Sequence, residues 1–314
     1  MQALYAFYQN EERDLAKCEK DLFTSIDKIY DLYIHLLTLL PAIRNIAQKV
    51  IEENKSKKLP TPEDLNPNLK FTTNPIFRKI EDSSLIRKLA LEKNISWQNE
   101  LELLKNIFTE IKNSEEYSNY LNEEREAKFI CHKDFIITIY KYYISQYEPL
   151  ENYFEGKNIH WCDDIGLVNS IMLKTILNMM ENEELQILPL YKNQEEDRTF
   201  AEDLFRKTIL HDAESMGYIS NKTRNWDIDR IAMMDVLLMK MAITEILYFE
   251  TVPIKVSLNE YIEISKLYST PKSKIFINGI LDKLVHDFRD ENKLVKTGRG
   301  LVDTSTPNPN LPIS

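Results

Sequence analysis

The chain contains little glycine. Only 6 of its 314 residues are glycine, against 13 phenylalanines and 16 tyrosines. Glycine-rich phosphate loops and barrels depend on glycine for tight turns and close backbone approach, so both are disfavoured. Long runs of helix-forming residues, with few alternating strand patterns, predict instead an all-α protein.

Cysteine is equally scarce. Cys18, Cys131 and Cys162 are scattered, odd in number and without metal-ligand spacing, so we expect reduced thiols in the core of a cytoplasmic protein. The five histidines do not form the repeated Glu-x-x-His pattern of a di-iron bundle. Phosphate-loop and Gly-x-Ser-x-Gly motifs are also missing. The sequence predicts no metal, no cofactor and no enzymatic activity.

A membrane-spanning run is lacking as well. The longest apolar stretch, residues 233–243, contains Asp235 and Lys240 and is too short to cross a bilayer. The first residues show no basic segment followed by an apolar core and a cleavage site. We therefore expect a soluble protein with no membrane partner.

Positive charge is sparse overall but unevenly distributed. The net charge of −10 argues against a general nucleic-acid coat, because phosphate contacts require clustered lysine and arginine. Residues 180–203 hold eight acidic and two basic residues, whereas residues 252–300 hold nine basic and six acidic ones. Any nucleic-acid site is therefore expected to be local and to lie in the last third.

The stretch Trp226–Val285 carries the clearest structural pattern, beginning with one helix. Asp227 and Asp229 are suitable capping and first-turn residues for a helix over Ile231–Phe249. That helix is apolar on nearly every face, which predicts a position in the middle of a bundle. Pro253 then ends it.

Two further helices are predicted after Pro253. Ser257 and Glu260 form a capping-box pattern for the second, and Thr270-Pro271 a start for the third. Gly279 indicates a close helix–helix contact. The other predicted elements are helices over Asp14–Asn54, with a break at Pro41 left open, and Thr199–Ser220; shorter helices near 83–92, 96–112, 123–147 and 162–181; and an acidic linker over Glu181–Asp197.

Two motifs carry a family resemblance. The run P-x-K-V-x-x-N-E-x-I-E-I-S-K spans Pro253–Lys266, and F-I-N-G-I-L-D spans Phe276–Asp282. With QALYAFYQ at Gln2–Gln9, these residues resemble the NusB family of bacterial transcription antitermination factors. The resemblance covers the first residues and about 80 residues from Leu204 to Val285. It implies an all-α, two-subdomain helical bundle with a large helical insertion.

This resemblance also implies a division of the chain. Residues 1–222 would form an N-terminal helical subdomain containing an insertion at about 50–190, and residues 223–290 the C-terminal NusB-like subdomain. Residues 291–314 are expected to be a disordered tail. The insertion resembles that of long members from the Bacteroidetes branch, and no function is predicted for it.

RNA binding is the main functional implication. In the family, the phenylalanine that matches Phe276 contributes to RNA binding beside an arginine-rich arm. Gln2 and Tyr5 match first-helix positions on the same side. The sequence begins after that arm should end, because it is truncated, its start is misassigned, or this member lacks the arm. A helix that opens abruptly at Met1 favours truncation.

Lys272, Lys274, Phe276 and Asn278 form the predicted RNA-binding turn. They lie at the start of a helix, where free N–H groups attract phosphate, and an aromatic ring there can stack on an unpaired base. The alternative is that Phe276 is a core residue and both lysines are merely solvated. Most members carry an acidic residue two positions before Lys274, where this chain has Lys272. This departure adds positive charge or alters the partner surface.

Asp235 is the predicted protein-partner residue. It matches an acidic position that faces the small-subunit ribosomal protein NusE in the family. We expect an exposed acid on the open face of its helix; an ion pair with Arg230 or Lys240 is the alternative.

The sequence is thus interpreted as a non-enzymatic antitermination factor. It would bind single-stranded boxA RNA of nascent ribosomal transcripts with NusE, acting indirectly on the RNA polymerase elongation complex. The alternatives are an interaction module without RNA binding and the NusB-like part of an rRNA methyltransferase, although the glycine-rich catalytic half of such an enzyme is missing. Whether the chain forms a homodimer stays open.

Overall fold

The computed structural model describes residues 1–123, 128–223 and 231–303. Every regular element in these ranges is helical, which confirms the predicted all-α class. The chain divides into two compact units. The first unit comprises Met1–Phe23 and Tyr191–Ser314, and the second comprises Thr24–Leu190. Each unit has its own hydrophobic core.

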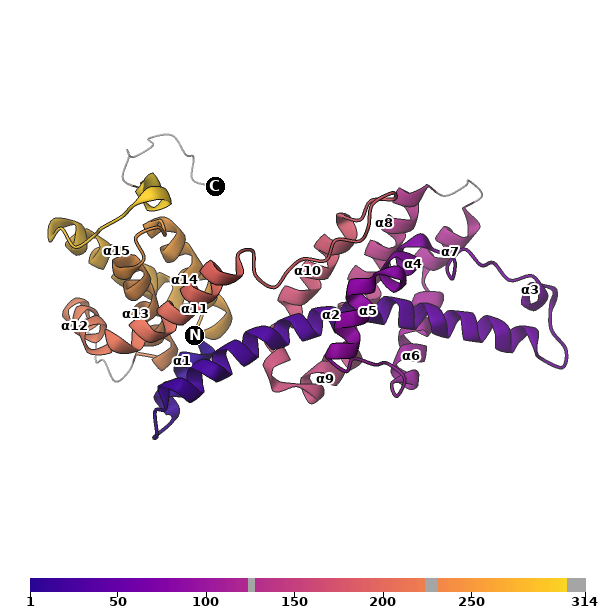
Figure 1. Cartoon of the computed structure of the whole chain (residues 1–314), viewed down its shortest axis with the longest axis horizontal. Helices are drawn as coiled ribbons and strands as arrows, with labels where there is room; N and C mark the ends of the chain where they lie inside the picture. Colours follow the sequence, from indigo (N-terminus) through magenta and orange to yellow (C-terminus); the bar gives the residue numbers. More distant parts are fainter. Residues whose placement is uncertain (124–127, 224–230, 304–314) are drawn as a thin grey trace. The chain divides into compact units, whose positions relative to one another are not determined.

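The first unit is built around α13 (Met233–Tyr248), as its apolar sequence predicts. Ten of its 16 residues are buried. The helices that pack against it are drawn in Figure 1. They are α1 (Gln2–Gln9), α11 (Gln194–Leu210), α12 (Asp212–Lys222), α14 (Ile254–Tyr268) and α15 (Ser273–Asp290).

The capping box predicted at Ser257 is wrong. Helix α14 begins at Ile254, directly after Pro253, and Ser257 is buried inside it. The Ser257 hydroxyl donates to Glu245 Oε1 at 2.6 Å, and the Tyr261 hydroxyl donates to Oε2 at 2.9 Å. A buried carboxylate needs such donors. Ser257 therefore satisfies Glu245 of α13 instead of capping its own helix.

Other predicted boundaries also shift. The single helix predicted over Thr199–Ser220 is two helices, α11 and α12, separated at His211, whose backbone (φ −98°, ψ 23°) leaves the helical region. The third C-terminal helix begins at Ser273 and not at Thr270-Pro271. The predicted caps at Asp227 and Asp229 lie outside the described residues.

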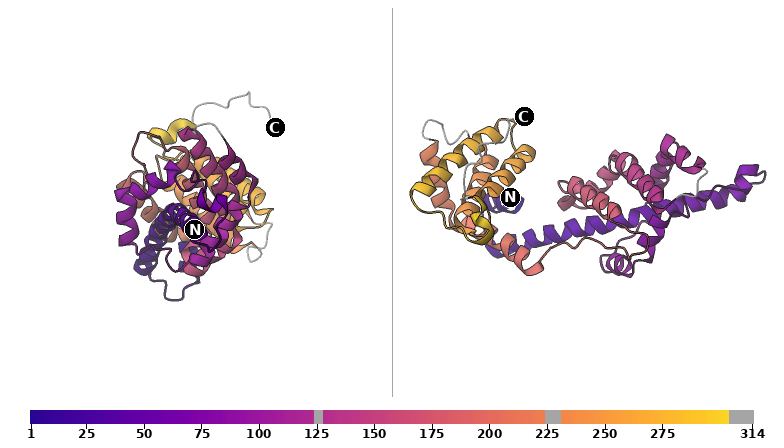
Figure 2. Two further views of the ribbon diagram at one scale, coloured as in Figure 1. Left: turned by 90° about the vertical axis from the view of Figure 1, so that its right-hand side faces the viewer. Right: turned by 90° about the horizontal axis from the view of Figure 1, so that it is seen from above.

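The second unit contains most of α2 (Leu15–Lys55), which Figure 2 shows as one unbroken helix. Pro41 lies inside it without ending it, and the neighbouring residues 39, 40 and 43 are buried in the core of this unit. This unit begins at Thr24, earlier than the insertion expected near residue 50, because most of α2 packs there. Its other elements are α3 (Pro62–Leu65), α4 (Pro75–Asp82), α5 (Ser84–Glu92), α6 (Leu101–Lys112), α7 (Glu115–Asn122), α8 (Phe129–Ile139), η1 (Tyr140–Ile144), α9 (Glu148–Lys157), η2 (Ile159–Trp161) and α10 (Ile165–Leu177).

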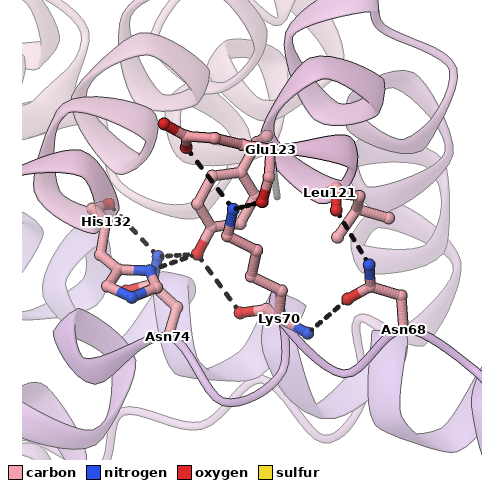
Figure 3. Close-up of polar contacts among 7 residues, drawn as sticks. Asn68, Lys70, Asn74, Leu121, Glu123 and His132 are labelled. Atoms are coloured by element: carbon pink, nitrogen blue, oxygen red, sulfur yellow. Dashed lines mark hydrogen bonds and ion pairs between the residues drawn. The ribbon is translucent and has the colours of Figure 1, made fainter. Parts of the chain in front are cut away.

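Asn74 belongs to a polar network in the second unit (Figure 3). Its side-chain oxygen caps α4 by accepting the Ile76 N–H at 2.9 Å. Its amide nitrogen donates to the Tyr120 hydroxyl at 3.1 Å and to the His132 carbonyl at 3.2 Å. The Tyr120 hydroxyl also lies 2.6 Å from His132 Nδ1. One buried amide therefore joins α4, α7 and α8.

Replacing Asn74 by alanine is expected to destabilise the second unit by about 2–3 kcal/mol, because one helix cap and two buried hydrogen bonds are lost. Hydrogen exchange of the whole chain should show faster exchange in α4, α7 and α8. Unchanged exchange in these helices would contradict this role. The exposed Asn122→Ala, in α7, is the matched control.

The segment after α15 differs from the disordered tail that was expected. Thr297 N–H donates to the Glu250 carbonyl at 3.0 Å, and Lys296 Nζ donates to the Phe249 carbonyl at 2.9 Å. The 3-10 helix η4 (Gly298–Asp303) follows. Gly300 approaches Glu250 so closely that an added Cβ would lie 2.1 Å from its carbonyl oxygen. Residues 291–303 therefore pack on the first unit; residues 304–314 lie outside the described residues.

Gly300→Ala is expected to release this segment, because neither the Cβ nor the Glu250 backbone can give way cheaply. The whole chain should lose about 1–3 kcal/mol of stability, and trypsin should cut faster at Arg299. Gly279 is the control. It was expected to mark a close helix contact, but nothing lies within 4 Å of an added Cβ there. Gly279→Ala should stabilise α15 by about 0.5–1 kcal/mol. Equal behaviour of the two variants would contradict both assignments.

Candidate nucleic-acid interface

The turn between α14 and α15 presents exposed lysines at a helix start. Lys272 is the N-cap of α15, and both it and Lys274 are exposed. The first turn of α15 contains no acidic residue. The first N–H groups of a helix have no partner within it, and the helix dipole places positive potential there. In α15 the Ser273 and Ile275 N–H groups already donate to the Thr270 and Lys272 carbonyls, at 2.9 and 3.2 Å. The turn therefore combines two ammonium groups with the positive end of the helix dipole.

The buried Asp235 anchors this turn by hydrogen bonds. It is only 5 % exposed, so the expectation of an exposed acid on an open face is wrong. Its Oδ1 accepts a hydrogen bond from the Ser269 hydroxyl, and its Oδ2 accepts one from the Ser273 hydroxyl at 2.8 Å. Ser273 also lies 2.9 Å from the Thr270 hydroxyl. The carboxylate thus ties α13 to the end of α14 and the start of α15.

The expected alternative for Asp235, an ion pair with Lys240, is not formed. Lys240 Nζ instead lies 2.5 Å from Asp212 Oδ1, on α12. Arg230, the other expected partner, lies outside the described residues. The physical reason is the spacing: Lys240 lies five residues after Asp235 on α13, whereas side chains on a helix meet at three or four.

Phe276 lies between the core and the surface. Its side chain is partly buried and packs against the hydrophobic core of the first unit, while the neighbouring Ile275 is 71 % exposed. The Asn278 amide donates to Asp282 Oδ2 at 2.9 Å, one turn further along α15. Phe276 is therefore partly packed and partly exposed, on the helix that carries Lys274.

Helix α1 carries the other two predicted residues, and one of them, Gln2, lies beside the residue that precedes this turn. Leu4 and Phe7 bury one face of α1, so Gln2 and Tyr5 are exposed on the other. Gln2 Nε2 lies 3.5 Å from the hydroxyl of Tyr268, the last residue of α14. Tyr268 was missed by the sequence reasoning, although its position four residues before Lys272 was a usable signal.

Other kinds of site find no support in the described parts of the chain. No cluster of three or more His, Cys, Asp or Glu side chains there could hold a metal ion. All three cysteines are free, but only Cys18 is buried; Cys162 is exposed, contrary to the expectation of core thiols. Among the described helices, none combines the length and the apolarity needed to cross a membrane.

Comparison with known proteins places the chain in a family. The sequence model of the NusB family matches residues 167–286. The transcription antitermination protein NusB of Salinibacter ruber is 50 % identical over 109 residues, which cover 35 % of this chain and 68 % of that protein. The chain belongs to the NusB family.

Two further NusB proteins support this membership. NusB of Chloroherpeton thalassium is 50 % identical over 86 residues, covering 27 % of this chain and 41 % of that protein. NusB of Geobacter sulfurreducens is 38 % identical over 94 residues, covering 30 % and 68 %. No solved structure matches the chain.

The NusB match covers only part of the candidate interface. Residues 167–286 include Asp235 and the whole α14–α15 turn, whereas Gln2 and Tyr5 lie outside them. The match begins within α10, so its first residues belong to the second unit. Most of the second unit has no counterpart in the matched NusB segment.

Proposed function

We propose that the chain is a transcription antitermination factor that binds boxA-type single-stranded RNA of nascent ribosomal transcripts together with the ribosomal protein NusE. Membership of the NusB family supports the antitermination role. The observation that carries RNA binding is the α14–α15 turn, where two exposed lysines and a helix start lie beside a partly exposed phenylalanine. That first turn contains no acidic side chain, and Lys272 and Lys274 outnumber the Asp235 carboxylate bonded to it, so the local charge favours phosphate despite the net charge of −10.

Each part of the turn has a distinct task in this proposal. Lys272 and Lys274 neutralise phosphates, and the positive end of the α15 dipole adds to their attraction for a phosphate oxygen. Phe276 stacks on an unpaired base, which single-stranded RNA offers and a duplex does not. Tyr5 and Asn278 contribute a second aromatic surface and an amide for base edges. Gln2 acts with Tyr268 at the border of the same surface.

NusE enlarges the RNA-binding surface. The proposed role of this chain is to bind RNA and NusE, without catalysis. Asp235, buried beneath the turn, supports the RNA-binding surface by fixing the positions of Ser269 and Ser273. The complex then reaches the RNA polymerase elongation complex through the RNA and NusE. The task is binding alone, which is consistent with a site made of lysine, aromatic and amide groups.

Competition binding tests this function. A labelled boxA RNA and a scrambled RNA of equal length are bound to the whole chain with and without NusE. We expect preference for boxA and tighter binding with NusE. Lys272→Gln with Lys274→Gln should lower the slope of log affinity against log salt concentration by about 1.4, or about 0.7 per phosphate contact. Lys283→Gln, on the same helix, is the control. NusE binding without any preference for boxA would instead identify a protein-interaction module.

A further inference from the structure

A second surface feature lies at the far end of α1. Gln2, Tyr5 and Gln9 are spaced to share one exposed face of this helix, which is about 12 Å long at 1.5 Å per residue. Gln2 contacts Tyr268 at one end. Gln9 Nε2 lies 3.1 Å from the sulfur of Met233, the first residue of α13, at the other. The exposed face therefore leads from the α14–α15 turn to the start of α13.

A cavity of about 210 Å³ lies at this start of α13. Met233, Val236 and Leu237 supply an apolar floor, and Tyr8, Arg13 and Lys240 complete the lining. Pockets for drug-sized ligands usually enclose about 300–1,000 Å³, so this one suits a smaller group such as a single nucleotide.

The two cations of the cavity differ in how they are paired. Lys240 lies 2.5 Å from Asp212, which also accepts the Tyr8 hydroxyl at 2.6 Å. Burial and this hydrogen bond raise the pKa of Tyr8, so its hydroxyl stays protonated as a donor. The Lys240 ammonium also lies 5.2 Å above the Tyr8 ring. Lys240 is thus neutralised within the protein.

Arg13 is the cation left available. In the described parts of the chain, Arg13 forms no hydrogen bond or ion pair. It lines the cavity together with Tyr8, and its positive charge lowers the pKa of Tyr8. Its backbone adopts φ 43°, a left-handed conformation that costs a non-glycine residue about 1–2 kcal/mol. Glu11 and Glu12 precede it but do not line the cavity. An apolar floor beside an unpaired guanidinium fits a flat ring joined to an anion.

We infer that this cavity is a further nucleotide subsite for single-stranded RNA, with the base on the apolar floor and its phosphate on Arg13. The inference rests on the proposed function, because the strand would reach the cavity along α1 from the α14–α15 turn. It assigns the RNA a direction across the first unit: Phe276, then Tyr5, then Arg13. An acidic peptide side chain could also form an ion pair with Arg13, but it would make little apolar contact with the floor of the cavity.

Photo-crosslinking with a single-stranded RNA that carries 4-thiouridine at successive positions tests the assignment on the whole chain. We expect crosslinks at peptides containing Phe276 from one end of the RNA, and at peptides containing Tyr8 or Met233 from the other. Crosslinks at Phe276 alone would overturn the subsite and leave the proposed function standing. No crosslink at either place would overturn both.

Two variants give the quantitative test. Arg13→Gln should lower the affinity for the full-length RNA about three- to ten-fold and the salt slope by about 0.7, as for one phosphate contact. Met233→Glu, at a 41 % exposed helix start that favours an acid, should lower it similarly without unfolding the chain. Lys17→Gln removes the same charge outside the cavity and should leave affinity unchanged. Equal effects of Arg13→Gln and Lys17→Gln would show only a general charge effect and overturn the subsite.

Discussion

Phe276→Ala is expected to lower the affinity of the chain for single-stranded RNA about ten- to one-hundred-fold, because one stacked base contributes about 1–3 kcal/mol. The same change removes part of a packed ring, so stability should fall by about 1–2 kcal/mol. Fluorescence anisotropy with labelled RNA and urea unfolding measure the two effects separately.

Phe276→Leu separates stacking from packing. Leucine keeps most of the apolar contact with the core of the first unit but offers no aromatic face. We expect it to bind RNA as weakly as the alanine variant while unfolding nearly like the original chain. Phe276→Tyr should retain binding. If the leucine variant binds RNA as well as the original, Phe276 is a core residue and not a stacking platform.

Asp235→Ala is expected to cost about 2–3 kcal/mol of stability, because it removes two hydrogen bonds to a buried carboxylate. RNA affinity should fall about ten-fold or more, since the turn that carries Lys272 and Lys274 loses its anchor. Asp235→Asn should be milder, because the amide can still accept one hydroxyl and donate to the other. Binding assays at a temperature where both variants are fully folded measure the effect on RNA.

The double variant Ser269→Ala with Ser273→Ala distinguishes support of the turn from direct contact with a partner. If Asp235 acts through the turn, removing its two hydroxyl partners should weaken RNA binding as the aspartate variants do, with NusE binding in the absence of RNA nearly unchanged. If Asp235 contacts NusE directly, its replacement should weaken NusE binding first. That second outcome would support the role predicted from the sequence, in which Asp235 contacts NusE.

The fold of the first unit was predictable where local patterns agree with tertiary packing. Apolar residues on nearly every face of α13 placed it in the middle of a bundle, and it is buried against its neighbours. Pro253 lies between two helices as predicted, but α13 already ends at Tyr248, and the proline directly precedes α14. Ser257 shows the limit of such patterns. Its local sequence matches a capping box, but its hydroxyl instead donates to the buried Glu245 carboxylate on another helix.

Asp235 could not be placed from sequence. An acid within an apolar helix fits an exposed face and a buried hydrogen-bonded position equally well. The residues that decide between them, Ser269 and Ser273, lie 34 and 38 positions away along the chain. Gln2 and Tyr5 were predicted only through the family resemblance, since nothing in their local pattern points to RNA binding. Their role stays a prediction.

The second unit was the least predictable part. Its helices follow ordinary apolar spacing, but the boundary between the two units, at Thr24, falls inside the continuous helix α2 and has no signal in the sequence. Asn74 likewise reads as a simple helix cap before a proline. Its contacts with Tyr120 and His132 emerge only when three helices pack together.

Hydrogen exchange of the whole chain, with and without boxA-type RNA, tests the central claim most directly. RNA bound as proposed should slow exchange in peptides covering residues 2–9 and 268–278, where Gln2, Tyr268 and Lys272 lie, and leave the second unit unchanged. A boxA RNA that binds but protects only the second unit, with residues 268–278 exchanging as before, would contradict the account.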